Sequence, residues 1–236
     1  MQKKMHMDDA VAVARGSPWL SQQDRRVQDA ICSRMCLVSL PRGRMLFHIE
    51  ESANELYCLV SGCAVITLAH PVQGVVNAHI MFPGRWFGEP AALGRRPRIL
   101  SVSARRSTEL LAISQAQIAE LLKADPTLCW AFFNLMAWNV EDDAPHPVDL
   151  LIIDPRLRLC SRLLTFGGRL LNYIPPSPVS IPMTQEELAA ASNMSRSTVY
   201  NLLGELVAQG LCELGYREVK ILDMVRLNRI VEEAHQ

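Results

Sequence analysis

The sequence predicts a two-domain α+β protein, and three successive patterns carry that prediction. Short β-rich runs broken by glycine and proline fill residues 37–113. A strongly apolar helical segment follows over residues 125–142. Residues 183–210 then have the pattern of two short helices joined by a tight turn, with a β-hairpin pattern directly after them. A length of 236 residues suits two modest domains.

Composition excludes the simplest argument for a nucleic-acid binder. The 24 basic residues are balanced by 24 acidic residues, so binding to DNA must be argued from local arrangement. The seven cysteines form no CxxC pair, and their odd number favours reduced thiols over a disulfide framework. Since no apolar run is long enough for a signal peptide or a membrane span, the sequence predicts a cytoplasmic protein.

The first domain is predicted to be a β-roll over residues 21–124, preceded by an N-terminal tail over residues 1–20. Residues 21–35 indicate one amphipathic helix with Ser21 as its cap. The β-rich runs that follow have the spacing of a compact antiparallel barrel or roll, with glycines where tight turns are needed. These runs are MLFHI, ELYCLV, CAVITLA, VVNAHIMF, WFG, ILSVSA and ELLAI.

Residues 125–153 are predicted to hold a dimerisation helix and a hinge. Over residues 125–142 the helix is apolar on more faces than a solvated surface helix tolerates, so it needs a partner. That partner is a second copy of the chain or, alternatively, the chain's own roll. Pro145 and Pro147 must then stop or sharply kink the helix, because proline donates no backbone hydrogen bond and restricts the residue before it.

The second domain, residues 154–236, begins with a predicted helix over residues 154–171. Thr184 is placed to cap the next helix, and Asn193 tolerates the left-handed turn that follows it. Ser195 caps the second helix of the pair, and Gly210 ends it. A hairpin around Gly215 and a last helix over residues 224–233 complete a helix-turn-helix with a wing.

Several stretches together carry a family resemblance. The stretch TQEELAAASNMSRSTVYNLLGELVAQGLCEL, with LPRGRMLF, ELYCLVSGCAVI and PGRWFGEPAALGRRPR in the roll, resembles the cyclic AMP receptor/fumarate-nitrate reductase regulator superfamily of bacterial transcription factors. The resemblance covers nearly the whole chain. It implies a cyclic-nucleotide-binding-type β-roll (a double-stranded β-helix), a dimerisation helix and a C-terminal winged helix-turn-helix.

The function implied by the resemblance is that of a homodimeric, sequence-specific transcriptional regulator controlled through the roll. Its partners would be double-stranded DNA with a pseudo-palindromic operator, a second copy of the chain and, for an activator, RNA polymerase. The alternative is a nucleotide-binding regulatory module whose DNA-binding half is degenerate and which acts through protein contacts.

In the family the second helix of the motif lies in the DNA major groove. Arg196 matches the residue that reads guanine, while Ser197 and Asn201 replace a frequent glutamate and a frequent arginine. Predicted base contacts are Arg196, Ser197, Tyr200 and Asn201. Predicted phosphate contacts are Thr184, Gln185, Ser195 and Thr198. Basic residues nearby, nearly balanced by acidic ones, are Arg156, Arg158, Arg162, Arg169, Arg217 and Lys220.

The resemblance also implies an effector site in the roll. Backbone amides at Gly88 and Ala91 would receive a cyclic phosphate, Glu89 would bind a ribose hydroxyl and Arg98 would pair with the phosphate. Two features depart from the nucleotide-binding pattern. The bulk of the two residues after the arginine would crowd a phosphate, and adenine-contacting hydroxyls are missing from the helix. The departing residues are Ile99, Leu100, Asp143 and Ala144. The alternative is an internal Glu89–Arg98 ion pair that holds the roll together.

Other chemistries leave weaker marks. An iron–sulfur sensor needs several clustered cysteines, and only Cys32 and Cys36 lie close together, where core packing is the commoner role. The histidines are isolated, so no haem, metal site or iron–sulfur cluster is expected. No catalytic constellation of Ser/His/Asp, paired carboxylates or a phosphate loop is present, and the chain is predicted not to be an enzyme.

Overall fold

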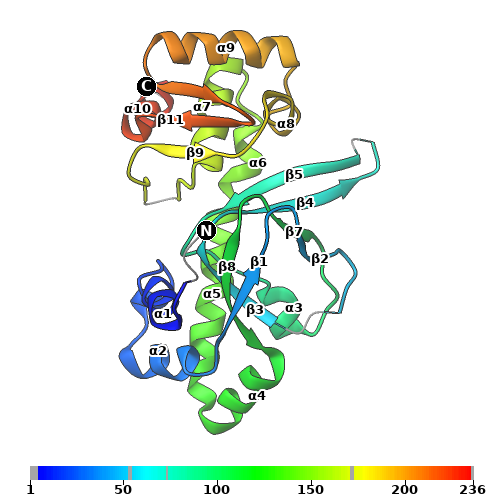
Figure 1. The fold of residues 1–236 in the computed structure, drawn as a ribbon, viewed down its shortest axis with the longest axis vertical. Helices are drawn as coiled ribbons and strands as arrows, with labels where there is room; N and C mark the ends of the chain where they lie inside the picture. Colours follow the sequence, from blue (N-terminus) through cyan, green and yellow to red (C-terminus); the bar gives the residue numbers. More distant parts are fainter. Residues whose placement is uncertain (1–4, 53–54, 73, 171–172, 235–236) are drawn as a thin grey trace. The chain divides into compact units, whose positions relative to one another are not determined.

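The computed structural model describes residues 5–52, 55–72, 74–170 and 173–234 (Figure 1). The chain divides into two compact units. The first comprises the chain up to Ile66 together with Met81–Val140, and the second comprises Thr67–Ile80 together with the chain from Glu141 onward. None of the helices in the described ranges has the length and apolar character needed to cross a membrane.

Two antiparallel sheets build the roll. One has the strand order β1-β8-β3-β6 and the other the order β2-β7-β4-β5. Gly62 follows a shift of register between β3 and β8 and has φ 86°; a Cβ there would lie 2.2 Å from the carbonyl oxygen of Ser107, so this turn requires glycine. The strands are β1 (Cys36–Leu40), β2 (Met45–Phe47), β3 (Glu55–Ser61), β4 (Ala64–His70), β5 (Gly74–Met81), β6 (Trp86–Phe87), β7 (Ser101–Ala104) and β8 (Thr108–Ser114).

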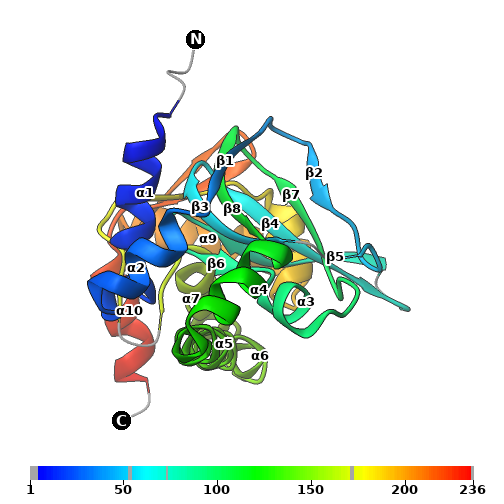
Figure 2. The ribbon, with the colours of Figure 1, turned by 90° about the horizontal axis from the view of Figure 1, so that it is seen from below.

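Helices cover the roll, and Figure 2 shows α1 and α2 on the side of β1, β3 and β8. Their buried side chains form one apolar cluster with Leu56, Trp86 and Leu111 of the strands, and with Phe132 and Leu135. The helices of this unit are α1 (Met7–Arg15), α2 (Arg25–Cys32), α3 (Glu89–Gly94), α4 (Gln115–Ala124) and α5 (Cys129–Asp143), the last of which crosses the boundary of the unit.

The prediction of a tail over residues 1–20 is wrong for its described part. Residues 7–15 form α1, and Ala10, Ala14, Trp19 and Leu20 are buried in the core of the roll. The indole Nε1 of Trp19 donates to the carbonyl oxygen of Ala131 at 3.0 Å, a contact between distant parts of the chain. The buried face of α1 consists of the alanines Ala10 and Ala14. Because alanine is only weakly apolar, the sequence shows little of the periodic pattern expected for a buried helix. Residues 1–4 lie outside the described ranges.

The cap of α2 also differs from the prediction. Asp24, rather than Ser21, accepts a hydrogen bond from the backbone N–H of Val27 at 2.8 Å, and α2 begins at Arg25. Ser21 lies in a short 3₁₀ turn, Leu20–Gln22. Asp24 lies three positions after Ser21 and is also a good capping residue. Its negative charge interacts favourably with the positive end of the helix dipole, which Ser21 could not do.

The predicted apolar helix begins later than expected. Residues Pro126–Leu128 form a 3₁₀ turn before α5 starts at Cys129. α5 ends at Asp143, as expected for the prolines, but Ala144 keeps helical dihedral angles of −58° and −37°. Pro145 therefore opens a further helix, α6 (Pro145–Asp149), where its missing N–H is no loss.

The second unit contains the predicted helix-turn-helix and wing. Its helices after α6 are α7 (Pro155–Phe166), α8 (Gln185–Ala191), α9 (Arg196–Ala208) and α10 (Met224–Glu233). α7 ends at Phe166, before the predicted end at Leu171, which lies outside the described residues. The wing strands β10 (Cys212–Gly215) and β11 (Glu218–Ile221) are joined by a strand that the sequence did not predict, β9 (Val179–Ile181), in the order β10-β11-β9.

Candidate nucleic-acid interface and effector site

The N-terminal end of α9 is held by a cluster of hydroxyl groups. Ser195 is its N-cap, and the side chain of Ser195 accepts from the backbone N–H of Thr198 at 3.1 Å. The same Oγ lies 2.9 Å from Oγ of Ser197 and 2.7 Å from Oγ1 of Thr198. Three hydroxyls and the amides of the first helical turn are therefore gathered at one point, an arrangement suited to a phosphate.

The predicted base-contacting residues project from the exposed side of α9. Arg196, Ser197 and Asn201 are exposed, and Tyr200 is 64 % exposed. The opposite side of α9 is buried through Val199, Leu203 and Leu206. Within the described ranges Arg196 makes no ion pair, and it is a cation in the first turn of a helix, where the dipole disfavours positive charge. That unfavourable position points to a binding role.

The turn before α9 has the geometry that its sequence predicted. Asn193 adopts the left-handed conformation with φ 51°. The preceding helix, α8, begins in a capping box: the backbone N–H of Thr184 donates to Glu187 Oε2 at 2.8 Å, and the backbone N–H of Glu187 donates to Thr184 Oγ1 at 3.1 Å. Thr184 can still donate its hydroxyl proton. Sequence reasoning recognised the cap but missed the role of Glu187, which the T-x-x-E spacing signals.

Several arginines near the motif are structural. Arg162 is buried and stacks on the ring of Phe166 at 4.4 Å; burial lowers its pKa, against the raising effect of Asp149. The Asp149 carboxylate, also buried, accepts from Ser161 Oγ at 2.6 Å and from Thr165 Oγ1 at 2.8 Å. The two arginines nearest this carboxylate are Arg162 at 4.0 Å and Arg169 at 3.9 Å. These two are therefore not free surface charges around the motif. Sequence reasoning gave Asp149 no role.

The C-terminal end of α9 is held by arginines from two other helices. Arg156 of α7 donates to Gln209 Oε1 at 3.0 Å, and Arg226 of α10 donates to the backbone carbonyl of Gln209 at 3.2 Å. Cations at this end complement the helix dipole and satisfy a terminal carbonyl. α9 is thus fixed at both ends, with its polar face exposed.

The structure brings together the four predicted effector residues of the roll. Gly88 adopts a left-handed conformation with φ 95° at the N-terminus of α3, and Glu89 and Ala91 of α3 are buried. The guanidinium of Arg98 donates from Nη1 to the carbonyl of Gly88 at 3.1 Å and from Nη2 to the carbonyl of Glu55 at 2.8 Å. Arg98 therefore binds the backbone of its own roll.

Packing fixes this arginine further. Its Cζ lies 4.0 Å from the centre of the Phe47 ring, a cation–π distance. Burial lowers the pKa of Arg98, while Tyr57, Glu55 and Glu89 raise it. A Cβ at Gly88 would lie 2.6 Å from Arg98 Nη1, so glycine is needed for the guanidinium to reach this carbonyl. Since the Glu89 carboxylate is one of the charges that favour the guanidinium, the geometry is compatible with the internal role weighed from sequence.

The four residues that depart from the nucleotide-binding pattern have different surroundings. Ile99 is 67 % exposed, and Leu100 packs against the apolar cluster between the sheets. Asp143 and Ala144 are exposed at the end of α5. The side chain of Leu100, which was expected to crowd a bound phosphate, packs against the core of the roll.

Comparison with known proteins agrees with this architecture. Residues 37–125 match the cyclic nucleotide-binding domain family, and residues 157–230 match the Crp-like helix-turn-helix domain family. A CRP-like cAMP-activated global transcriptional regulator of Mycobacterium tuberculosis is 25 % identical over 201 residues, which are 85 % of this chain and 90 % of that protein. The cyclic AMP receptor protein of Thermus thermophilus is 27 % identical over 191 residues, 80 % of this chain and 85 % of its own.

A solved structure extends the agreement in fold. A putative cyclic nucleotide binding protein from Ruegeria pomeroyi superposes with a TM-score of 0.67 at 21 % identity, over 97 % of this chain and 99 % of that one. A β-roll, a long apolar helix and a winged helix-turn-helix with an exposed recognition face together define a DNA-binding transcriptional regulator with an N-terminal sensory domain. The chain belongs to the cyclic AMP receptor/fumarate-nitrate reductase regulator family.

Proposed function

We propose that the protein acts as a homodimer in the cytoplasm and binds a pseudo-palindromic operator through the exposed face of α9. The observation that carries this proposal is the position of Arg196 between hydroxyl-bearing residues at the start of α9, where it forms no ion pair with any described residue. Its guanidinium suits guanine O6 and N7, and Asn201 suits adenine. Ser197 and Tyr200 complete the base-reading set. Gln185, Thr184, Ser195 and Thr198 contact phosphates. RNA polymerase is a further partner if the regulator activates.

Operator binding is tested by selecting genomic fragments with the purified protein and measuring mobility shifts. We expect Arg196→Ala to abolish the shift, because the bidentate contact to guanine contributes about 1–3 kcal/mol per half-site. Arg229→Ala is the matched control, since Arg229 is an exposed arginine on α10. Absence of a shift on every fragment would favour the other class of function, a regulator that acts through protein contacts.

The proposed dimer contact is the exposed apolar stripe of α5. Trp130 is 66 %, Phe133 61 % and Val140 68 % exposed. They follow one another at helical spacing, whereas Ala131, Phe132 and Leu135 of the same helix are buried in the roll. The alternative in which the helix packs only on its own roll would leave this stripe in water, which supports a second copy as its partner.

Light scattering at micromolar concentration tests the dimer. We expect the mass of a dimer for the native chain and of a monomer for Phe133→Glu, because the substitution places a charge in the contact. Ala116→Glu adds the same charge on the exposed face of α4 and should remain dimeric. A monomeric native chain would refute the proposal.

For the roll, we propose that Arg98 holds the fold through the carbonyls of Gly88 and Glu55, rather than serving a cyclic phosphate. Both hydrogen bonds and the Phe47 contact support this. The named relatives include cyclic AMP receptors, so cyclic AMP is the second candidate. Calorimetry with cyclic AMP and cyclic GMP separates the two. Heat of binding that Arg98→Ala abolishes, in a variant that still melts cooperatively, would establish the nucleotide site.

A further inference from the structure

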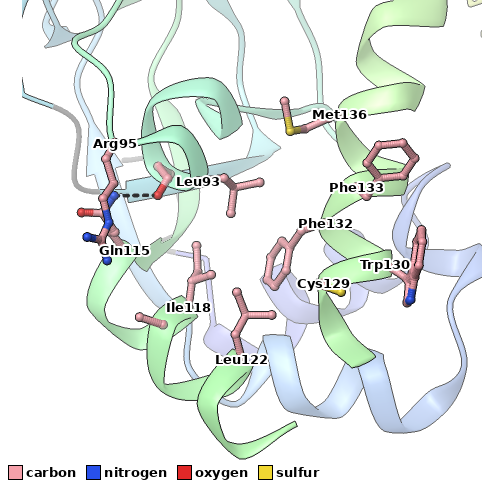
Figure 3. Close-up of a pocket in the computed structure, with 12 residues that line it drawn as sticks. Leu93, Arg95, Gln115, Ile118, Leu122, Cys129, Trp130, Phe132, Phe133 and Met136 are labelled. Atoms are coloured by element: carbon pink, nitrogen blue, oxygen red, sulfur yellow. Dashed lines mark hydrogen bonds between the residues drawn. The ribbon is translucent and has the colours of Figure 1, made fainter. Parts of the chain in front are cut away.

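A pocket of about 430 Å³ lies between α3, α4 and α5. Figure 3 shows side chains of the three helices converging on it. It lies wholly within the first unit and is separate from the Arg98 cluster: neither Arg98 nor Gly88 lines it. Its volume is in the range of sites that bind small organic molecules.

The walls of the pocket are apolar. Leu93 comes from α3, Ile118 and Leu122 from α4, and Phe132 and Phe133 from α5. Ile118 and Phe132 are buried, so their positions in the walls are fixed by the packing of the roll. Leu93 and Leu122 are partly exposed and Phe133 is exposed, so a ligand with an aliphatic or aromatic body would remove these three surfaces from water and gain the hydrophobic contribution.

One end of the pocket is cationic. Arg95 is the only charged residue among those that line it, and it lies beside Gln115, away from Trp130 and Phe133 (Figure 3). Within the described ranges Arg95 forms no ion pair. It is the C-cap of α3, where a left-handed conformation, here with φ 54°, commonly ends a helix. Gln115 donates to the carbonyl of Ala92 at 2.9 Å, which ties α4 to α3 and fixes this end.

The pocket lies on the flank of the proposed dimer stripe. Its α5 residues Cys129, Phe132 and Met136 follow at spacings of three and four, as residues on one helix face do. Two residues of the proposed dimer stripe, Trp130 and Phe133, also line the pocket, whereas Val140 does not. A second copy packed on the stripe would therefore border the ligand on the side of Trp130 and Phe133.

We propose that this pocket binds a small amphipathic organic anion. The carboxylate of the ligand pairs with Arg95, and its apolar body lies against the accessible side chains of Leu93, Leu122 and Met136. Apolar walls with a single cation at one end are complementary to an anion with one apolar tail. The proposal is independent of operator binding and of any nucleotide at Arg98.

Equilibrium binding of dodecanoate tests the proposal, read by calorimetry and by displacement of the fluorescent anion 8-anilinonaphthalene-1-sulfonate from the full-length protein. We expect saturable binding of one dodecanoate per protomer. Arg95→Gln should weaken it about tenfold, the effect expected from losing one charge-assisted hydrogen bond. Arg96→Gln, the neighbouring exposed arginine outside the lining, should leave it unchanged.

A filling variant gives a second, independent readout. Ala119 lines the pocket and is exposed, so Ala119→Trp should block binding without disturbing the core. Absence of binding, or equal binding by the native chain, Arg95→Gln and Ala119→Trp, would overturn the proposal. So would dodecanol binding as tightly as dodecanoate, since the cation would then have no role. Dissociation of the dimer by Ala119→Trp would also overturn it and identify the partner chain as the occupant.

Discussion

At the scale of single residues, Arg196 lies where function and stability oppose each other. It is the first residue of α9, and the positive end of the helix dipole repels its charge. We expect Arg196→Ala to leave the free energy of unfolding unchanged or to raise it by about 0.3–1 kcal/mol. Urea unfolding measures this on the same sample that has lost operator binding. A marked loss of stability would instead assign Arg196 a structural role.

Asp149 gives the opposite case, a buried charge with a structural role. Its carboxylate accepts hydrogen bonds from Ser161 and Thr165 and faces Arg162 and Arg169. We expect Asp149→Ala to destabilise the second unit by about 3–5 kcal/mol, because it removes one partner of a buried charged network. Glu213→Gln, in the exposed pair with Lys220, should cost less than about 1 kcal/mol. Comparable losses in urea unfolding would contradict this assignment.

The buried thiols predict how stability depends on pH. Burial raises the pKa of Cys63 to about 12 and that of Cys160 to about 11. Such thiols keep their protons in the folded chain, whereas the unfolded chain releases them above about pH 8.5, so stability is complete below that pH and declines above it. Urea unfolding with a reductant should show a falling free energy of unfolding between about pH 8 and pH 10. Cys63→Ala should make that slope shallower; an unchanged slope would exclude Cys63 as a cause.

At the scale of elements, the N-terminal segment belongs to the roll. The buried Trp19 packs edge-to-face on Trp86 with ring centres 4.8 Å apart, and Trp86 donates to Ser17 Oγ at 2.9 Å. We expect Trp19→Ala to cost about 3–5 kcal/mol through the cavity it leaves. Met7→Ala, at a partly exposed position of α1, should cost far less. Thermal unfolding of both variants measures the difference, and equal midpoints would restore the idea of a tail.

The elements also show what sequence patterns can and cannot predict. α9, the left-handed Asn193 and α10 were predicted because caps, turn residues and apolar spacing are local signals. α1 and β9 were missed because alanines and a three-residue strand carry little local signal and gain their stability from distant partners. The DNA-reading and effector residues were inferred from the family resemblance and stay predictions. The Asp149 network depends on tertiary contacts that no local pattern reveals.

At the scale of the whole molecule, the neutral net charge shapes DNA binding. The four proposed phosphate contacts are three hydroxyls and one amide, and Arg162 and Arg169 are engaged near Asp149. Few counterions would therefore be released. We expect the logarithm of operator affinity to fall against the logarithm of salt concentration with a slope no steeper than about −5. Mobility shifts over a salt series measure this slope, and a value near −10 would require many more cationic contacts than α9 and the wing supply.

The hydrogen bond from Trp19 to Ala131 has a consequence for synthesis. It joins residues 112 positions apart, so the start of the roll must wait for its acceptor until α5 has left the ribosome. Until then the indole N–H lacks this acceptor, and closing so long a loop is slow. The sensory domain therefore becomes complete late, when the helix proposed to recruit a second copy is itself emerging.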